Sequence, residues 1–296
     1  MKKVKANAYD VITAKVIAQL ESAEAGQWQK GWVSAAGGLA TSMSTGKAYR
    51  GINQLVLMWA GLPDKRWGTY KAWQDVGAQV PKGCAGTAVL FFSTFDKKDR
   101  AGNKTGETGA FAKISYVWNA TQVENAPALP VVETPNLAER NAAVDEFIAN
   151  TGADIRHGQA GAFYKPTADW IGMPDRELFV DTETSSATEG YYSTVLHELA
   201  HWTGHRSRLD RVFEGSKRFG GEAYSVEELV AELASTMACA ELGVEAEPRA
   251  DHAQYLASWL KVLKADNRAI VTAAKHAQAA VEHLHSLQEP EVSEAA

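Results

Sequence analysis

Residues 191–205 read YYSTVLHELAHWTGH, and this stretch decides how the second half of the chain is organised. His197 and His201 are four residues apart, so on a helix both imidazoles lie on one face, about one turn from each other. Apolar neighbours and the absence of a helix breaker predict a largely buried helix. Glu198 occupies the position of a general base that holds a metal-activated water. The pattern therefore favours a metal-binding helix of the metallopeptidase type over a core helix with hydrogen-bonded histidines.

The third ligand has to come from elsewhere, because a catalytic zinc usually takes three protein ligands and keeps a fourth position for water. The metzincin spacing HExxHxxGxxH fails here, since Gly204 is present but Ser207 occupies the position of the last histidine. His205 is one turn beyond His201, yet three ligands on consecutive turns of one helix spread too far apart to converge well. We expect His205 to contact a ligand imidazole or a substrate instead.

Residues 225–236, SVEELVAELAST, contain the better candidate. Ser225 and Glu228 form a predicted capping box, and apolar residues follow at helical spacing. The segment resembles the glutamate helix of gluzincins, in which the first acid of an ExxxE or ExxxD pair binds zinc and the second orients a ligand histidine. This resemblance assigns Glu228 as third ligand and Glu232 as the orienting carboxylate. Two alternatives stay open: Glu228 only caps its helix, or Glu227 is the ligand.

Composition sets the wider frame. The chain has 296 residues, of which 45% are hydrophobic, enough for one large domain or two smaller ones. No run of 18 apolar residues predicts a transmembrane helix, and the basic residues 1–5 are not followed by the apolar segment of a signal peptide. Cys84 and Cys239 are too few and too distant for a disulfide framework or a thiolate metal site. We therefore expect a cytoplasmic protein without a membrane partner.

Charge divides the chain into two parts. Residues 1–126 contain 16 Lys and Arg against 9 Asp and Glu, whereas residues 127–296 contain 14 against 27. The boundary coincides with three prolines within nine residues, which indicate an extended connection. We predict a basic domain over residues 1–126, a linker over 127–136, an acidic domain over 137–288 and a disordered acidic tail over 289–296.

The basic part interleaves aromatic residues with Lys and Arg. Such a surface suits single-stranded nucleic acid, because bases stack on aromatic rings and cations follow the phosphates. The alternative is that most Trp side chains are core residues and the Lys are solvated. The candidate DNA-binding residues are Lys30, Trp32, Lys47, Tyr49, Arg50, Asn53, Arg66, Trp67, Tyr70, Lys71 and Lys82.

The predicted fold class is α+β in both parts. In the first part we expect helices near residues 9–22 and 53–60 and a hairpin of strands 87–95 and 111–118. In the second part we expect short strands near 153–156, 162–164 and 177–180, and helices near 137–150, 188–204, 225–242, 252–264 and 268–287. Strand 177–181 is the candidate edge that would bind a substrate backbone by β-addition.

The order of motifs resembles that of the plasmid-encoded ArdC-type antirestriction proteins over residues 7–285. In the first part the matching segments are 45–53 (TGKAYRGIN), 67–71 (WGTYK) and 77–83 (GAQVPKG). In the second part they are Tyr164, 169–174 (DWIGMP), 197–205 (HELAHWTGH), 206–211 (RSRLDR), 219–220 (FG) and 224–232. The resemblance implies a single-stranded-DNA-binding domain followed by a zincin-like metallopeptidase domain.

What the resemblance implies about function is an expectation to test. Such proteins bind DNA, single-stranded in preference to double-stranded, and shield an incoming conjugative plasmid from host restriction endonucleases. A restriction endonuclease or another DNA-bound protein is then a candidate partner. Whether the peptidase domain contributes to protection stays open, as does a purely structural role for the metal.

The predicted mechanism needs one divalent metal. Zn²⁺ suits two histidines and a glutamate best, although Mn²⁺ is also compatible with a carboxylate-containing site. With His197, His201 and Glu228 as ligands, Glu198 would accept a proton from water and pass it to the leaving amine. Tyr224 or His205 would stabilise the oxyanion.

Overall fold

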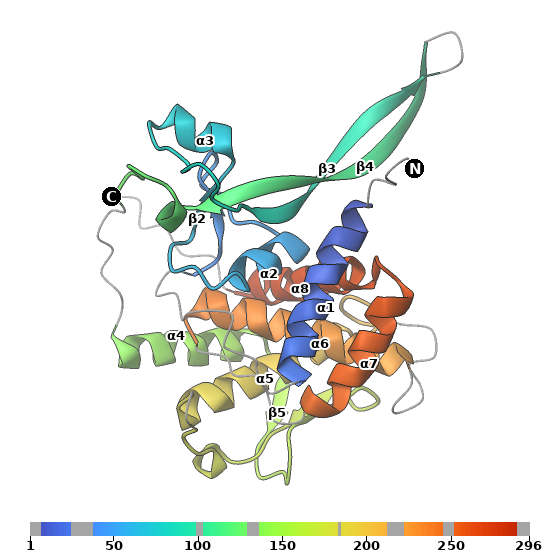
Figure 1. Ribbon diagram of the computed structural model, residues 1–296. Coiled ribbons are helices and arrows are strands. Elements are labelled where there is room, and N and C mark those ends of the chain that lie inside the picture. The colour runs from blue at the N-terminus through green and yellow to red at the C-terminus, as the bar shows by residue number, and fades with distance from the viewer. Residues whose placement is uncertain are drawn as a thin grey trace, which may run out of the picture.

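A computed structural model describes residues 7–24, 38–98, 103–128, 136–182, 185–211, 222–244 and 252–288. Helices and strands are interspersed along the chain (Figure 1). The helices are α1 (Ala8–Glu24), α2 (Ile52–Met58), α3 (Tyr70–Asp75), α4 (Leu137–Asn150), α5 (Ala187–Thr203), α6 (Glu222–Leu242), α7 (His252–Ala265) and α8 (Ala269–Ser286), with two 3₁₀ turns, η1 (Ala120–Gln122) and η2 (Arg176–Leu178). The strands are β1 (Thr41–Ser42), β2 (Arg66–Gly68), β3 (Thr87–Lys98), β4 (Lys104–Asn119), β5 (Asp154–Arg156), β6 (Phe163–Lys165) and β7 (Trp170–Gly172).

The first sheet has the strand order β1-β2-β4-β3. Its two long strands, β3 and β4, pair antiparallel in continuous register from Thr87 opposite Val117 to Asp96 opposite Thr108. The base of this hairpin rests on the helices, and its outer half extends beyond them as a two-stranded ribbon (Figure 1). The hairpin predicted from the sequence is present, and it is longer than expected.

The second sheet is small and lies beside the helix that carries the HExxH motif. Its order is β5-β7-β6, with β5 parallel and β6 antiparallel to the central strand. Ile171 of β7 is fully buried and packs in the same core as α5. Ser186 and Glu189 form a capping box at the start of α5, which satisfies backbone groups that would otherwise lack partners.

One hydrophobic core joins the two parts of the chain. It contains Ile12 of α1 and Leu55 of α2 together with residues of α5, α6 and α8. Helix α1 packs against α7, and α2 packs against α8. The hydroxyl of Thr13 also donates to the carbonyl of Asn267 at 2.7 Å. The α+β class is confirmed, and the two predicted parts share this core. Residues 129–135 of the predicted linker and the predicted tail, residues 289–296, lie outside the described residues.

Two local expectations are wrong. Residues 177–180 do not form a strand, since η2 ends at Leu178 and the chain then continues without pairing. Leu178 and Val180 are 67% and 74% exposed, so no apolar face is buried that would hold a strand in place. Ser225 is not an N-cap, because α6 already includes Glu222; Ser225 is buried and its carbonyl accepts a hydrogen bond from the indole of Trp259 at 2.9 Å.

Among the described residues, no helix combines the length and the apolar character that crossing a bilayer requires.

Candidate metal centre

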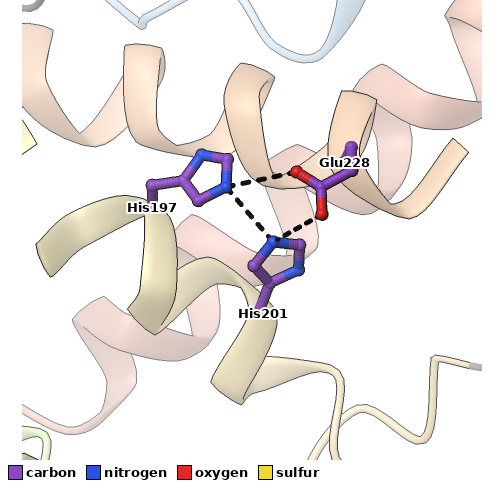
Figure 2. A group of neighbouring side chains, drawn as sticks. All are labelled: His197, His201 and Glu228. Carbon is purple, nitrogen blue, oxygen red and sulfur yellow. Dashed lines mark hydrogen bonds and ion pairs between the residues drawn. The ribbon is translucent and has the colours of Figure 1, made fainter. Parts of the chain in front are cut away.

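Helix α5 presents two histidines side by side in the interior. The Nε2 atoms of His197 and His201 are 3.2 Å apart, and His197 is only 5% exposed. The one-turn spacing of the sequence produces this arrangement, because residues four apart share a helix face. Figure 2 shows both rings directed toward the same point. Two imidazole nitrogens this close require a proton or a cation between them.

Helix α6 packs against α5 and brings a carboxylate to the same point. Glu228 has Oε2 at 3.5 Å from Nε2 of His197 and Oε1 at 3.5 Å from Nε2 of His201 (Figure 2). One ligand atom from each of the three side chains lies within 4.8 Å of the other two. The structure therefore brings together the two histidines and the glutamate that the sequence had placed on separate helices. Since α6 begins at Glu222, Glu228 is not a helix cap.

Two further carboxylates face the outer nitrogens of the rings. Oε1 of Glu227 is 3.1 Å from Nδ1 of His201, and Oε2 of Glu232 is 3.4 Å from Nδ1 of His197. The first contact has hydrogen-bond geometry; the second is close but leaves Nδ1 of His197 without a formed hydrogen bond. Carboxylates in these positions fix the orientation of a ligand imidazole. Glu227, the alternative ligand, thus contacts the opposite side of its histidine.

Arg211 holds Glu227 in place. It lies in the family-like segment 206–211, but no local spacing indicates this role. Its Nε and a terminal nitrogen donate to the two carboxylate oxygens of Glu227 at 2.8 Å and 2.6 Å. It also donates to the carbonyl of Ala200 at 2.8 Å and to the hydroxyl of Thr203 at 3.1 Å. The Arg211 side chain is only 2% exposed, so a fixed chain of contacts runs from arginine through Glu227 to His201. Arg211 follows α5 by eight residues, and only the fold reveals the contact.

The electrostatics of the three groups fit a cation. Burial lowers the pKa of His201, but hydrogen bonds to Glu227 and Glu228 outweigh burial and raise it to about 10. Burial raises the pKa of Glu228, but the two histidines outweigh it and hold that pKa well below its usual range. The site thus favours positive charge at its centre despite its burial. A divalent metal would take that place and release protons on binding.

Of the remaining predicted site residues, Glu198 and Tyr224 lie on the two helices that carry this group, and His205 does not. Glu198 is 3% exposed on α5, immediately after the first ligand histidine. Tyr224 is on α6 one turn before Glu228, so both residues share a helix face. His205 lies outside the group: its Nδ1 is 2.7 Å from the hydroxyl of Ser207. The structure therefore does not bring His205 to the metal position.

A second polar cluster fixes the chain after α5. The hydroxyl of Tyr164 donates to Asp169 at 2.7 Å, and Arg208 donates to the same carboxylate at 3.0 Å through one nitrogen and more closely through another. The guanidinium of Arg208 also lies 3.7 Å from the ring centre of Trp202. Asp169 has a φ of 54°, a conformation that Asp and Asn tolerate better than most residues. These contacts hold the segment between the HExxH helix and Arg211.

The predicted DNA-binding residues separate into two groups. Trp67 is 1% exposed and belongs to a small core with Val89 and Val117. The amide of Asn53 exchanges two 2.7 Å hydrogen bonds with the backbone of Leu90. Arg66 binds the carboxylate of Asp64 and is largely buried. Trp67 is therefore a core residue, which corrects its assignment to a DNA surface. Asn53 and Arg66 are partly buried and engaged in structural contacts, and their role at DNA stays a prediction.

The other candidates are more accessible or lie outside the described residues. Lys47, Arg50, Tyr70, Lys71 and Lys82 are exposed, whereas Tyr49 is half-buried. Arg50 is paired with Glu282, and Lys71 is paired with Asp75 at 2.9 Å. Lys30 and Trp32 fall outside the described residues. These surface residues remain predictions.

The helix pair with its two histidines and glutamate has the arrangement of a zincin-like metal site, and residues 142–276 match the zincin-like metallopeptidase family. Residues 6–120 match the N-terminal domain of anti-restriction factor ArdC. The chain belongs to the ArdC antirestriction family, which confirms the resemblance found in its motifs.

Solved structures and other proteins resemble the chain over nearly its whole length. Crystal structures of the antirestriction protein ArdC from plasmid R388 are 36% identical, one metal-free with a TM-score of 0.74 over 95% of this chain and 97% of that one, the other Mn(II)-bound with a TM-score of 0.73 over 96% and 98%. The protein y4eC of Sinorhizobium fredii (strain NBRC 101917 / NGR234) is 39% identical over 95% of this chain and 92% of its own length. The DNA primase TraC of Escherichia coli is 35% identical over 99% of this chain, which spans 28% of that primase. The Mn(II)-bound relative and the zincin-like region together support a divalent metal.

Proposed function

We propose that this chain is a DNA-binding antirestriction protein that shields incoming plasmid DNA, with single strands as its preferred ligand, and that carries a metal-dependent peptidase centre. The observation that supports it most is the buried group of His197, His201 and Glu228 in a chain of the ArdC family. The related primase TraC acts on DNA, and the basic composition of residues 1–126 is compatible with a phosphate backbone.

His197, His201 and Glu228 would hold the metal, with Zn²⁺ and Mn²⁺ as the two candidates. Bound there, the cation would supply Lewis acidity and a water molecule of lowered pKa. Glu227 holds the His201 imidazole by a hydrogen bond, and Glu232, 3.4 Å from Nδ1 of His197, would orient the other imidazole.

Glu198 would move the proton. Its place next to His197 on α5, in the interior, is that of a general base that takes a proton from water and delivers it to the leaving nitrogen of a peptide bond. Tyr224 shares a helix face with Glu228 and is the better candidate for contact with the developing oxyanion, since His205 is held by Ser207.

A second function deserves the same test: a peptidase that DNA recruits to a DNA-bound protein, such as a restriction endonuclease. This function requires a catalytic metal. Glu198 is consistent with one, because a site that only stabilises the fold requires no general base and tends to close its fourth position. In that case proteolysis, rather than coverage of the DNA, would protect the plasmid.

One experiment separates the two. DNA is incubated with the metal-loaded protein or with Glu198→Gln, a restriction endonuclease is added, and both DNA cleavage and the length of the endonuclease chain are followed. Equal protection by both forms with an intact endonuclease supports shielding by DNA binding. Protection by the unaltered protein alone, with a clipped endonuclease, supports the recruited peptidase. If neither form protects, the antirestriction proposal is wrong.

A further inference from the structure

The outer half of the β3–β4 ribbon exposes large apolar side chains that no mechanism above uses. Phe91, Phe95 and Phe111 are 46%, 50% and 44% exposed. By contrast, Trp67 and Trp73 of the same part of the chain are buried almost completely. Among the described residues of this part, the ribbon therefore carries most of the exposed large aromatic side chains, whereas Trp67 and Trp73 are core residues.

The strand register places these three rings on one face. Opposite partners in an antiparallel ladder share a face, and so do alternate residues of each strand. Phe91 is opposite Lys113, Ser93 is opposite Phe111, and Phe95 is opposite Gly109. The rings therefore alternate between the two strands, at intervals of ~7 Å along the ribbon. Those of Phe95 and Phe111 are 6.1 Å apart, centre to centre.

Glycine at position 109 lets one ring lie across the ribbon. A Cβ at Gly109 would be 2.5 Å from Cζ of Phe95 and within 3.0 Å of both ring Cε atoms. One side of the Phe95 ring thus rests on the backbone of β4. With half of its surface still exposed, the ring offers its other side outward.

The same face is covered nearer the base of the hairpin. Val89 and Val117 point to this side and are buried with Trp67. Beyond them the apolar residues continue, but the cover from the rest of the chain ends and the ribbon extends past the helices (Figure 1). On the opposite face Ala112 and Ile114 pack against the main core, and the exposed rings there, Phe92 and Tyr116, are separated by these packed residues.

A cation lies among the rings. The Nζ of Lys113 is 4.8 Å from the ring centre of Phe91, and within the described part of the chain it has no carboxylate partner. Lys97 and Lys104, nearer the tip, are paired with Glu107 at 2.9 Å and with Asp96 at 2.5 Å. Among the ribbon lysines whose side chains the structure describes, Lys113 can therefore pair with an anionic ligand without first leaving an acidic partner.

We propose that Phe91, Phe95, Phe111 and Lys113 form a stacking platform for single-stranded DNA. This inference rests on the proposed DNA-binding function and assigns it to a surface. Regularly spaced rings receive successive unpaired bases, and an unpaired ammonium beside them binds the phosphate chain. Bases of a duplex are already stacked and paired, so the platform selects single strands.

The test measures binding of a fluorescent oligothymidylate and of a duplex of the same length to the full chain at several salt concentrations. Phe95→Ala with Phe111→Ala should weaken single-strand binding by about tenfold per ring and leave duplex binding within about twofold. Lys113→Gln should weaken both and reduce the salt slope for single strands by about 0.7. Phe92→Ala is the matched control, since Phe92 is 53% exposed on the opposite face of the same ribbon.

The outcomes are distinguishable. If the unaltered chain does not bind oligothymidylate, the proposed DNA-binding function fails. If it binds and the double Phe variant binds equally well, or no worse than Phe92→Ala, only the platform is refuted. Far-UV circular dichroism checks that each variant is folded, and sedimentation measures its oligomeric state. A double variant that keeps its DNA affinity but changes its oligomeric state would assign the face to self-association and overturn the proposal.

Discussion

The metal centre and the β3–β4 ribbon differ in which side chains they bury: the first buries charged groups, and the second exposes apolar ones. At the metal centre, charged side chains are buried and held by one another, from Arg211 through Glu227 to His201. On the ribbon, apolar side chains such as Phe95 are held half-exposed by a scaffold of backbone hydrogen bonds. Both arrangements place groups where their solvation is unfavourable until a partner arrives, a cation in one case and an aromatic base in the other. The difference predicts which changes affect stability and which affect only binding.

Removing a ligand histidine should have the largest effect. His197→Ala leaves His201 and Glu228 without the third donor, so we expect metal content after dialysis to fall from one equivalent to none. His205→Ala is the control, because its ring is bound to Ser207 and should leave metal content unchanged. Elemental analysis of both variants with Zn²⁺ and Mn²⁺ measures the effect. A metal-loaded His197→Ala protein would show that the group in Figure 2 is not the binding site.

Truncating one large apolar residue in each region should sharpen the contrast. Leu199 is fully buried on α5, and Leu199→Ala should lower the free energy of unfolding by about 2–5 kcal/mol through lost burial and a residual cavity. Phe95→Ala should change it by less than about 1 kcal/mol, because half of the ring already faces water. Urea denaturation of the metal-free protein compares them. Equal losses would mean that Phe95 is a core residue, and the platform would lose its basis.

The same contrast explains what the sequence could predict. The spacing of His197 and His201 encodes positions on one helix face, so local periodicity was sufficient to propose them. Glu228 was proposed from the resemblance of its segment to the glutamate helix of gluzincins. Arg211 and its contact with Glu227 depend on how a loop returns to α5 and α6, which no local pattern records. Likewise, Trp67 and Phe95 are both aromatic residues near lysines. Only the strand register and the packing of α2 show that one is buried and the other is exposed.

Weakening the support of a ligand should have an intermediate effect. Arg211→Met removes both hydrogen bonds to Glu227, so His201 loses its fixed orientation, and metal affinity should fall by about 10–100-fold. Arg206→Met removes an exposed arginine of the same segment and should leave affinity unchanged. Competition with a chromophoric chelator measures both. Equal metal affinities of the two variants would mean that the contacts from Arg211 through Glu227 to His201 serve packing only.

The smallest effect should come from changing the cluster of Tyr164, Asp169 and Arg208. Its exposure lies between that of the buried metal centre and that of the exposed ribbon. Hydrogen bonds from Arg208 lower the pKa of Asp169 to about 2, below the value of about 3.9 in an unfolded chain. A lowered pKa in the folded state means that the carboxylate stabilises the protein above pH ~4 and that this contribution disappears as the pH falls toward 2.

Asp169→Asn isolates that contribution, because Asn tolerates the φ of 54° at this position. We expect the variant to be less stable than the unaltered protein by no more than about 1 kcal/mol between pH 5 and 7, since water screens the partly exposed pair. The difference should narrow from pH 4 downward, because protonation of Asp169 then removes the same charge that the substitution removes. Thermal unfolding of both proteins across this range measures it. A difference in stability that stays constant down to pH 2 would mean that the cluster acts through shape and hydrogen bonding rather than through the charge of the carboxylate. The cluster would then resemble the packed interior in how it stabilises the protein.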